Sequence, residues 1–451
     1  MARVVRRITT DFGGLRSLQA HRELILNAIS LLGTAAITSV LGFAFWAVAA
    51  RLLPISAVGF ASSTISLMML LSTVGMLGFG TMLIGQLASG RSARDGLSAA
   101  ALLCSSMVAA VLAAVVVLVG HLFRLLPLLA ADGTCELLVV GSALTTLTLV
   151  FDQAVIGLLA GHVQLLRNAV AGVVKLIVVF GSARLLLRGF GGGVVLAWLV
   201  GTAISLPLCL IGFGGPVRRV LFQRPNWRAL HGVRGLTVFH TMLNFSTQAP
   251  RLVLPILATS LVSPASGGAF YVAFMLAQVL FYLPTSLGTV LFAIGAGKLS
   301  ALRQKCRFTL SVSLLGGIVG VTGLMVLRGP LLYLFGSSYR ALASTAIVIL
   351  SAAYGPVVFK VHYVAIVRVT GQLKRGALVA AVGGAVEIIG ACVGAIIGHI
   401  TGLCLAWLGA LTLEMLVTAP AVFRAVGGPK GRTGLDGGDC IADLAPGLAP
   451  Q

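Results

Sequence analysis

The sequence predicts an all-α polytopic membrane protein with about 12 transmembrane helices in two six-helix lobes. Hydrophobic residues make up 58% of the 451 residues and charged residues only 10%, and the mean hydropathy is +1.06. Apolar runs recur that are long enough to cross about 30 Å of hydrocarbon. Basic residues gather in alternate connections between these runs.

The predicted spans follow one another with mostly short connections. They fall near 26–50, 58–88, 97–120, 136–160, 165–186, 191–214, 236–262, 268–296, 308–327, 342–367, 377–398 and 401–423. The first run is longer than the roughly 7–15 apolar residues of a secretory signal peptide, so we expect a retained helix.

Basic residues orient the chain. With the amino terminus inside, 23 of the 32 Lys and Arg residues lie in cytoplasmic segments and six lie outside. This asymmetry follows the positive-inside rule and predicts a multi-pass plasma-membrane protein with both termini in the cytoplasm. The net charge of +21 therefore reflects topology and attraction to anionic membrane lipids, and no nucleic-acid partner is expected.

A polar loop divides the spans six and six. We expect a basic cytoplasmic leader at 1–25, an N-lobe at 26–214, a basic cytoplasmic loop at 215–235, a C-lobe at 236–425 and a disordered cytoplasmic tail at 426–451. Each lobe starts and ends on the cytoplasmic side. This symmetry predicts parallel repeats with a substrate cavity between them.

Arg251 lies between Pro250 and Pro255 inside an apolar run. If the segment is a helix, Asn244, Gln248 and Arg251 share one polar face. A charge at membrane depth is costly unless it is paired or hydrated, which makes Arg251 a candidate substrate-binding residue. The alternative is a buried structural ion pair.

Further polar residues extend the predicted substrate-binding set. Gln278 and Tyr282 share one face of the eighth span, and Asn27 belongs to a polar stripe on the first span. Arg51 directly follows that first span. We expect these side chains to line the cavity together with Arg251.

Three carboxylates within the spans are candidates for ion or proton coupling, or for structural pairs. Asp152 is expected to pair with Lys175, and a proton or substrate role is its alternative. Glu387 lies among glycines and is expected to be buried, paired or protonated, whereas the sequence assigns no partner to Glu414. Lys360 is expected to extend its ammonium group to the inner interface.

The sequence lacks the motifs of enzymatic chemistry. It has no Walker-type glycine loop, dinucleotide fingerprint or His-Glu-x-x-His sequence. The seven cysteines are scattered without a Cys-x-x-Cys pair, so we interpret them as packing residues. We therefore expect a protein that is not an enzyme and has no cofactor and no metal site.

Four short segments carry a family resemblance. They are TSVLGFAFWAVAARLLP at 38–54, AVGFAS at 57–62, GMLGFGT at 75–81, and FDQAVIGLL at 151–159 with the Arg167-Asn168 that follows. Together they resemble polysaccharide-transport (Wzx-like) flippases of the multidrug/oligosaccharidyl-lipid/polysaccharide (MOP) exporter superfamily, especially actinobacterial ones. The resemblance implies a MATE/MOP-flippase-like fold with a cationic cavity and alternating access. Its cavity arginines map to Arg251 and Arg51.

The resemblance also implies a function. We expect a transporter that flips a polyprenyl-pyrophosphate-linked oligosaccharide from the inner to the outer leaflet, for cell-envelope polysaccharide (lipopolysaccharide or exopolysaccharide) biosynthesis. Its expected partners are this lipid-linked glycan, membrane lipids, and a polysaccharide polymerase or glycosyltransferases.

Other functions remain as alternatives. An H⁺- or Na⁺-coupled multidrug antiporter of the same superfamily would use Asp152, Glu387 or Glu414. A membrane glycosyltransferase or polymerase would need a sizeable outer loop, and the predicted outer loops are short. A purely structural scaffold has no positive indication.

Overall fold

The computed structural model describes residues 33, 37–88, 96–123, 133–185, 191–213, 215–221, 223–233, 238–295 and 302–427. Every regular element within these ranges is a helix, which confirms the predicted all-α class. A helix satisfies its backbone polar groups within one segment, as an apolar solvent requires. The predicted leader, most of the predicted tail and the candidate residue Asn27 lie outside the described residues.

The helices have the lengths that membrane spans need. In the described part of the chain, eight are long and apolar enough to cross a bilayer, or nine if one bent pair counts as a single span. This bent pair consists of α13 (Ser337–Ala352) and α14 (Tyr354–Val369), which meet at 43°. The span predicted at 342–367 is therefore bent in its middle.

The described residues form two compact units. The first takes residues up to Leu52 and from Leu71 to Thr237, and the second takes Leu53–Leu70 and the residues from Val238 onward. The first unit contains the helix Ile37–Leu52, the end of α3 (Ile55–Gly75), α4 (Phe79–Ala88), α5 (Leu97–Phe123), α6 (Thr134–Gly157), α7 (Gly161–Leu185), α8 (Gly192–Phe213), α9 (Gly215–Leu221) and the 3₁₀ helix η2 (Trp227–Val233).

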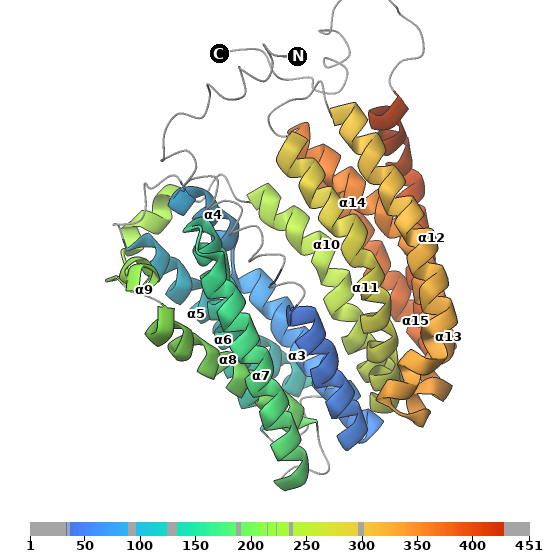
Figure 1. Cartoon of the computed structure of the whole chain (residues 1–451), viewed down its shortest axis with the longest axis horizontal. Coiled ribbons are helices and arrows are strands. Elements are labelled where there is room, and N and C mark those ends of the chain that lie inside the picture. Colours follow the sequence, from blue (N-terminus) through green and yellow to red (C-terminus); the bar gives the residue numbers. More distant parts are fainter. Residues whose placement is uncertain are drawn as a thin grey trace, which may run out of the picture. The chain divides into compact units, whose positions relative to one another are not determined.

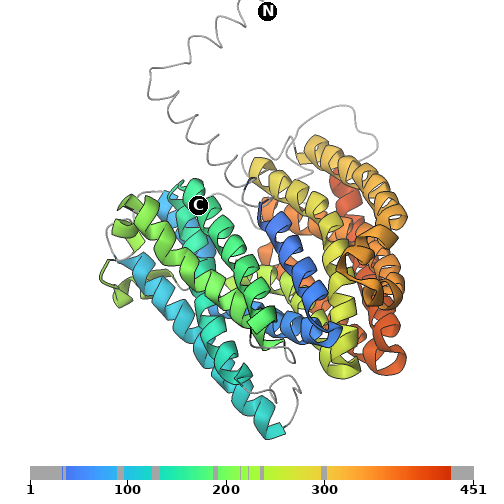
Figure 2. The ribbon, with the colours of Figure 1, turned by 60° about the horizontal axis from the view of Figure 1, so that its bottom comes forward.

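The second unit is a helical bundle, whose residues from Val238 onward are drawn in yellow-green to red and whose part of α3 is drawn in blue in Figures 1 and 2. It contains the start of α3, α10 (Val238–Leu257), the π-helical turn η3 (Ala258–Val262), α11 (Pro264–Gly295), α12 (Leu302–Phe335), α13, α14 and α15 (Leu373–Gly427). Within it, α15 packs against α10 and α14, and α11 packs against α12, α13 and α14.

Residues Leu53–Leu70 belong to the second unit, whereas the sequence places them in an N-lobe at 26–214. Two glycines explain this packing of α3 against α11. A side chain on Gly59 of α3 would collide with the backbone of α11, and one on Gly268 of α11 would collide with the backbone of α3. Hydrogen bonds also join α3 to η3 in the same region. The Ser63 hydroxyl donates to the Thr259 hydroxyl, and that of Thr259 donates to the carbonyl oxygen of Gly59.

The span predicted at 58–88 is broken into α3 and α4. The turn between them places Leu77 and Gly78 at φ values of 48° and 77°. Glycine adopts this left-handed backbone without a steric penalty, so Gly78 allows the chain to change direction. A hydrogen bond from the Phe79 amide to the Met76 carbonyl oxygen (2.8 Å) closes the turn.

The helix α15 is a hairpin rather than one rod. Its backbone is non-helical at Gly398 and His399, which is where the sequence separates the spans 377–398 and 401–423. Gly394 and Gly402 face each other beside the break, because a side chain on either would collide with the carbonyl group of the other. The first and second halves of α15 therefore run side by side from the turn.

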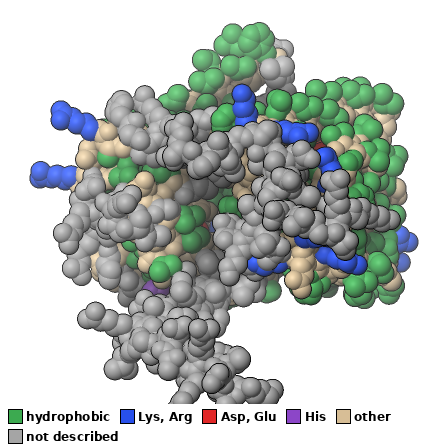
Figure 3. Space-filling model, turned by 90° about the horizontal axis from the view of Figure 1, so that it is seen from above, with side chains coloured by type: hydrophobic (Ala, Val, Ile, Leu, Met, Phe, Trp, Pro, Cys, Tyr) green, Lys and Arg blue, Asp and Glu red, His purple; other side chains and the backbone are tan. Residues whose placement is uncertain are grey.

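One end of the second unit is basic. Arg303 at the start of α12 donates hydrogen bonds to the carbonyl oxygens of Val426 and Gly427, which brings the start of α12 beside the end of α15. The exposed basic residues of this end are Arg303, Arg307, Lys374, Arg375 and Arg424. Lys and Arg side chains are prominent among the described residues in Figure 3, which views the molecule from the top of Figure 1.

Candidate functional site

The helix α10 continues through both Pro250 and Pro255. A proline has no amide hydrogen, so each one releases a backbone carbonyl from the helical pattern. Pro250 releases the carbonyl of Ser246, and Gly384 of α15 packs directly against that oxygen: a Cβ at Gly384 would lie 2.7 Å from it. The prolines and the glycine therefore set how closely α10 and α15 approach.

Arg251 is half-buried on this helix. Within the described residues it makes no hydrogen bond or ion pair. The Glu387 carboxylate on α15 acts on its guanidinium group through charge, and Tyr282 on α11 lies within electrostatic reach of it. The predicted alternative of a direct structural ion pair is therefore not seen at Arg251, which retains donors for another group.

The other polar residues of α10 and of the turn that follows it lie in different surroundings. The carbonyl oxygen of the Asn244 side chain accepts a hydrogen bond from Arg368 of α14 (2.6 Å), while Gln248 is exposed. Thr259 lies in the π-helical turn and is buried against Ser63. Asn244 and Arg368 lie 124 residues apart along the chain, so the sequence alone does not indicate their hydrogen bond.

On α11, Gln278 is half-buried and Tyr282 is 57% exposed. Thr285 on the same face donates its hydroxyl hydrogen to the carbonyl oxygen of Phe281 (2.7 Å), a bond within its own helix. Of the predicted α11 residues, the structure thus brings Tyr282 into electrostatic reach of Arg251.

A buried charge cluster lies next to this face. The Lys360 ammonium group of α14 donates to a carboxylate oxygen of Glu387 and to one of Glu414 (2.9 Å). The second oxygen of Glu387 accepts the indole N–H of Trp407 (2.7 Å). Lys360, Glu387 and Glu414 are all buried, with exposures of 6%, 2% and 7%.

The α15 hairpin makes this cluster. Glu387 lies on its first half and Glu414 on its second half, and the break at Gly398 and His399 returns the chain so that the two carboxylates meet the same lysine. Gly383 provides the space for Glu414, because a Cβ at Gly383 would lie 2.6 Å from the carboxyl carbon.

One sequence expectation is wrong at this cluster, and one point that the sequence leaves open is answered. Lys360 does not extend to the interface but pairs with carboxylates inside the bundle. Glu414, which had no evident partner, bonds to Lys360. Neither pairing could be predicted from the sequence, because the partners lie 27 and 54 residues away along the chain and meet only through helix packing.

The first unit contains a separate buried pair, and it is not the predicted one. Asp152 of α6 accepts two hydrogen bonds from Arg167 of α7, at 2.7 and 2.5 Å, and a longer one from the side-chain amide of Asn168 (3.3 Å). Arg167 is buried and lies within a candidate span.

The turn between α6 and α7 explains this partner. The helix α6 ends at Gly157 and α7 begins at Gly161, so Asp152 and Arg167 lie at nearly equal distances from the turn. Lys175 lies about 12 Å further along α7, at 1.5 Å per residue. Its ammonium group instead lies 3.4 Å from the ring centre of Trp198 on α8.

Arg51 ends the first helix and is exposed. The structure groups it with the first unit and Arg251 with the second. That Arg51 also contacts substrate therefore stays a prediction.

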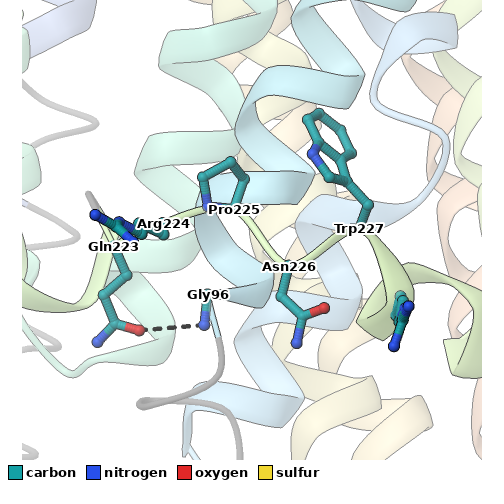
Figure 4. A pocket seen from close by; sticks show the side chains of 7 residues that line it. Gly96, Gln223, Arg224, Pro225, Asn226 and Trp227 are labelled. Atoms are coloured by element: carbon teal, nitrogen blue, oxygen red, sulfur yellow. Dashed lines mark hydrogen bonds between the residues drawn. The ribbon is translucent and has the colours of Figure 1, made fainter.

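An open groove of about 790 Å³ lies in the first unit, at the basic loop (Figure 4). It is lined by Gly96, Gln223, Arg224, Pro225, Asn226, Trp227 and Arg228. The Gln223 side-chain oxygen accepts the amide hydrogen of Gly96 (3.1 Å), and the amide of Asn226 donates to the Gly96 carbonyl oxygen (3.2 Å). Gly96 has a φ of 63°, which favours glycine.

Comparisons with solved structures define the class of the fold. An inward-facing multidrug-resistance MATE transporter of the MOP superfamily matches with a TM-score of 0.64 and 16% identity, over 88% of this chain and 98% of that one. The lipid II flippase MurJ in an inward closed conformation matches at 0.62 and 15% identity, over 88% and 87%. No family model and no curated protein matches the sequence.

A third structure bears on the charge of the site. It is a MOP superfamily transporter from Pyrococcus furiosus, described as having a binding pocket of reverse polarity that suggests a different function. It matches with a TM-score of 0.60 and 14% identity, over 89% of this chain and 96% of that one. The chain thus has the fold of the MATE and MOP transporters, as predicted.

Proposed function

We propose that this protein flips a polyprenyl-pyrophosphate-linked oligosaccharide from the inner to the outer leaflet of the plasma membrane by alternating access, for cell-envelope polysaccharide biosynthesis. The observation that carries the proposal is Arg251, a half-buried guanidinium group without a hydrogen-bonded partner among the described residues. A cation held in this way is suited to an anionic substrate.

The chemistry of such a substrate fits the face around Arg251. A pyrophosphate cannot cross hydrocarbon unaided, and a planar guanidinium group binds phosphate oxygens with two charge-assisted hydrogen bonds. The exposed side chains of Gln248 and Tyr282 supply donors and acceptors for sugar hydroxyl groups. The polyprenyl chain would remain in the lipid.

The basic loop supports the direction of transport that we propose. Arg224, Trp227 and Arg228 are exposed. Arginine side chains at the cytoplasmic surface attract anionic lipids, and tryptophan favours the headgroup region. We therefore place this loop at the inner leaflet, from which the substrate is taken.

An ion-coupled multidrug antiporter is the alternative, because MATE multidrug transporters share the fold. A cationic drug would need a carboxylate that is available to it. In the described ranges, however, Asp152 is bonded to Arg167, and Glu387 and Glu414 are bonded to Lys360. Arg251 would also repel a cation.

Substitution of Arg251 tests the proposed function. In proteoliposomes, we would measure the transfer of a fluorescent polyprenyl-pyrophosphate-linked sugar between leaflets, at matched amounts of folded protein. Arg251→Lys should lower the rate about tenfold or more, because a point charge replaces the planar fork. Arg251→Ala should lower it further. Arg340→Ala, at an exposed position on α13, is the matched control and should transport normally.

Two results would contradict this role. Near-normal transfer by a well-folded Arg251→Ala protein would remove Arg251 from substrate recognition. Extrusion of a cationic dye by the wild-type protein, without transfer of the lipid-linked sugar, would favour the antiporter.

A further inference from the structure

The Lys360 cluster has an unequal number of charges. One ammonium group is shared by two carboxylates, and all three side chains are buried. If every group is ionised, the trio carries a net charge of −1. A buried net charge is unfavourable unless a neighbouring charge or a proton compensates it.

Arg251 is a cation whose charge acts on this trio. Its guanidinium group and Glu387 feel each other's charge, although they do not form a direct ion pair. Counted together, Arg251, Lys360, Glu387 and Glu414 are neutral. The neutrality of these four groups therefore depends on Arg251, which binds the substrate in the proposed function.

We propose that Glu414 takes up a proton when an anionic substrate binds to Arg251, so that the anion and the proton bind together. This inference rests on the proposed function. A pyrophosphate would neutralise Arg251 and leave the trio with an uncompensated negative charge. A proton from water then converts the Glu414 carboxylate to the acid, while Lys360 remains an ammonium ion bonded to Glu387.

Geometry selects Glu414 over Glu387 as the proton acceptor. Glu387 receives N–H groups from both Lys360 and Trp407, and it also lies within electrostatic reach of Arg251. Glu414 receives one side-chain donor, from Lys360, and its carboxyl group also lies against that of Glu387. A carboxylate with fewer donors and no second cation is the easier one to protonate.

Other ionisable groups also face this region. Tyr363 of α14 feels the charges of Glu414 and Arg375, and Tyr282 of α11 feels that of Arg251. His362 of α14 is buried, and its ring nitrogen Nδ1 bonds to the carbonyl oxygen of Val358 (2.8 Å). None of these groups is bonded to a carboxylate of the trio in the described part of the chain, so Glu414 remains the proposed acceptor.

The proposal predicts whether protonation of Glu414 strengthens or weakens anion binding. Coupling between two ligands is reciprocal, so a proton on Glu414 must strengthen anion binding as much as the anion strengthens proton binding, typically about 5- to 150-fold. Anion affinity should therefore fall as pH rises through the titration of Glu414. An exchanger of protons against substrate has the opposite sign, because its two ligands weaken each other.

The test uses the full-length protein in detergent with farnesyl pyrophosphate as the probe. Calorimetry in two buffers that differ in ionisation enthalpy gives the protons taken up per bound probe. Per bound probe, wild-type protein should take up a fraction of a proton more than Glu414→Gln, whose amide imitates the neutral acid. The probe changes its own protonation equally in both experiments, so the difference reports on Glu414. Glu414→Gln should bind the probe at alkaline pH as tightly as wild-type protein does at acidic pH.

An infrared difference spectrum of the wild-type protein provides a second measurement that does not depend on a variant. A protonated-carboxyl band should appear on addition of farnesyl pyrophosphate and should not appear with farnesol. Equal proton uptake in both proteins, together with no such band, would overturn the linkage but leave the proposed function intact if Arg251→Ala weakens binding. Proton release would overturn it by sign, and no binding at all would overturn both proposals.

Discussion

The two buried charge groups of this protein differ in balance. In the first unit, Asp152 meets one arginine, whose two N–H groups bond to its two oxygens. In the second unit, one lysine is shared between Glu387 and Glu414. The first group is neutral and its geometry is closed, whereas the second depends on a neighbouring charge.

This difference assigns a structural role to the pair in the first unit. The proposed role of the cluster in the second unit is to respond to a change of charge beside it. The bidentate pair of Asp152 and Arg167 joins α6 to α7 close to their turn. An unequal cluster changes its protonation when its surroundings change charge. Burial alone does not distinguish them, because all five residues are at most 7% exposed.

The largest expected effect is at the pair in the first unit. Arg167→Met should lower the free energy of unfolding by about 3 to 5 kcal/mol, because it leaves a buried carboxylate without its partner. Thermal unfolding in detergent would measure this. Combining Arg167→Met with Asp152→Asn should recover part of the loss. A double variant no more stable than Arg167→Met would contradict the pairing.

The next effect compares the two carboxylates of the cluster. Glu387→Gln should lower the free energy of unfolding by about 1 to 3 kcal/mol, because Lys360 and Arg251 lose the carboxylate between them. Glu414→Gln should cost less than about 1 kcal/mol, since Lys360 keeps Glu387. Thermal unfolding of both proteins at one pH would show this order. The reverse order would identify Glu414 as the structural partner and weaken the proposed linkage.

A smaller effect is expected where backbone packing supports Glu414. Gly383→Ala should cost about 1 to 2 kcal/mol, because its methyl group would displace the Glu414 carboxyl group. Gly409→Ala is the matched control in the same hairpin, as a Cβ there meets nothing within 4 Å. We expect its thermal stability to change by less than about 1 kcal/mol. Equal stabilities for the two variants would show that Glu414 does not need the space beside Gly383.

The smallest effect is expected at Lys175. Lys175→Met should change the free energy of unfolding by less than about 1 kcal/mol, because the loss of the contact with Trp198 is offset by the loss of a buried charge. The same unfolding assay applies. If Lys175→Met were as unstable as Arg167→Met, Asp152 would depend on both cations and the closed pair would not be complete.

Residue type and spacing single out the candidate residues of the site, but they do not give the pairing of the buried charges. Arg251 was identified because a charge flanked by prolines is unusual in an apolar run. The partner of Asp152 was predicted wrongly because sequence spacing does not give the length of the turn after Gly157. Once that turn is known, Arg167 lies level with Asp152 and Lys175 does not.

The sequence by itself determined that this is an all-helical membrane protein, with most of its spans and the separation of the last two near Gly398. These features follow from hydrophobicity, proline and glycine, whose effects act within a few residues. Only the tertiary structure decided which charges meet. Lys360 finds partners 27 and 54 residues away, because ion pairing depends on the depth and rotation of packed helices, and neither quantity is encoded locally.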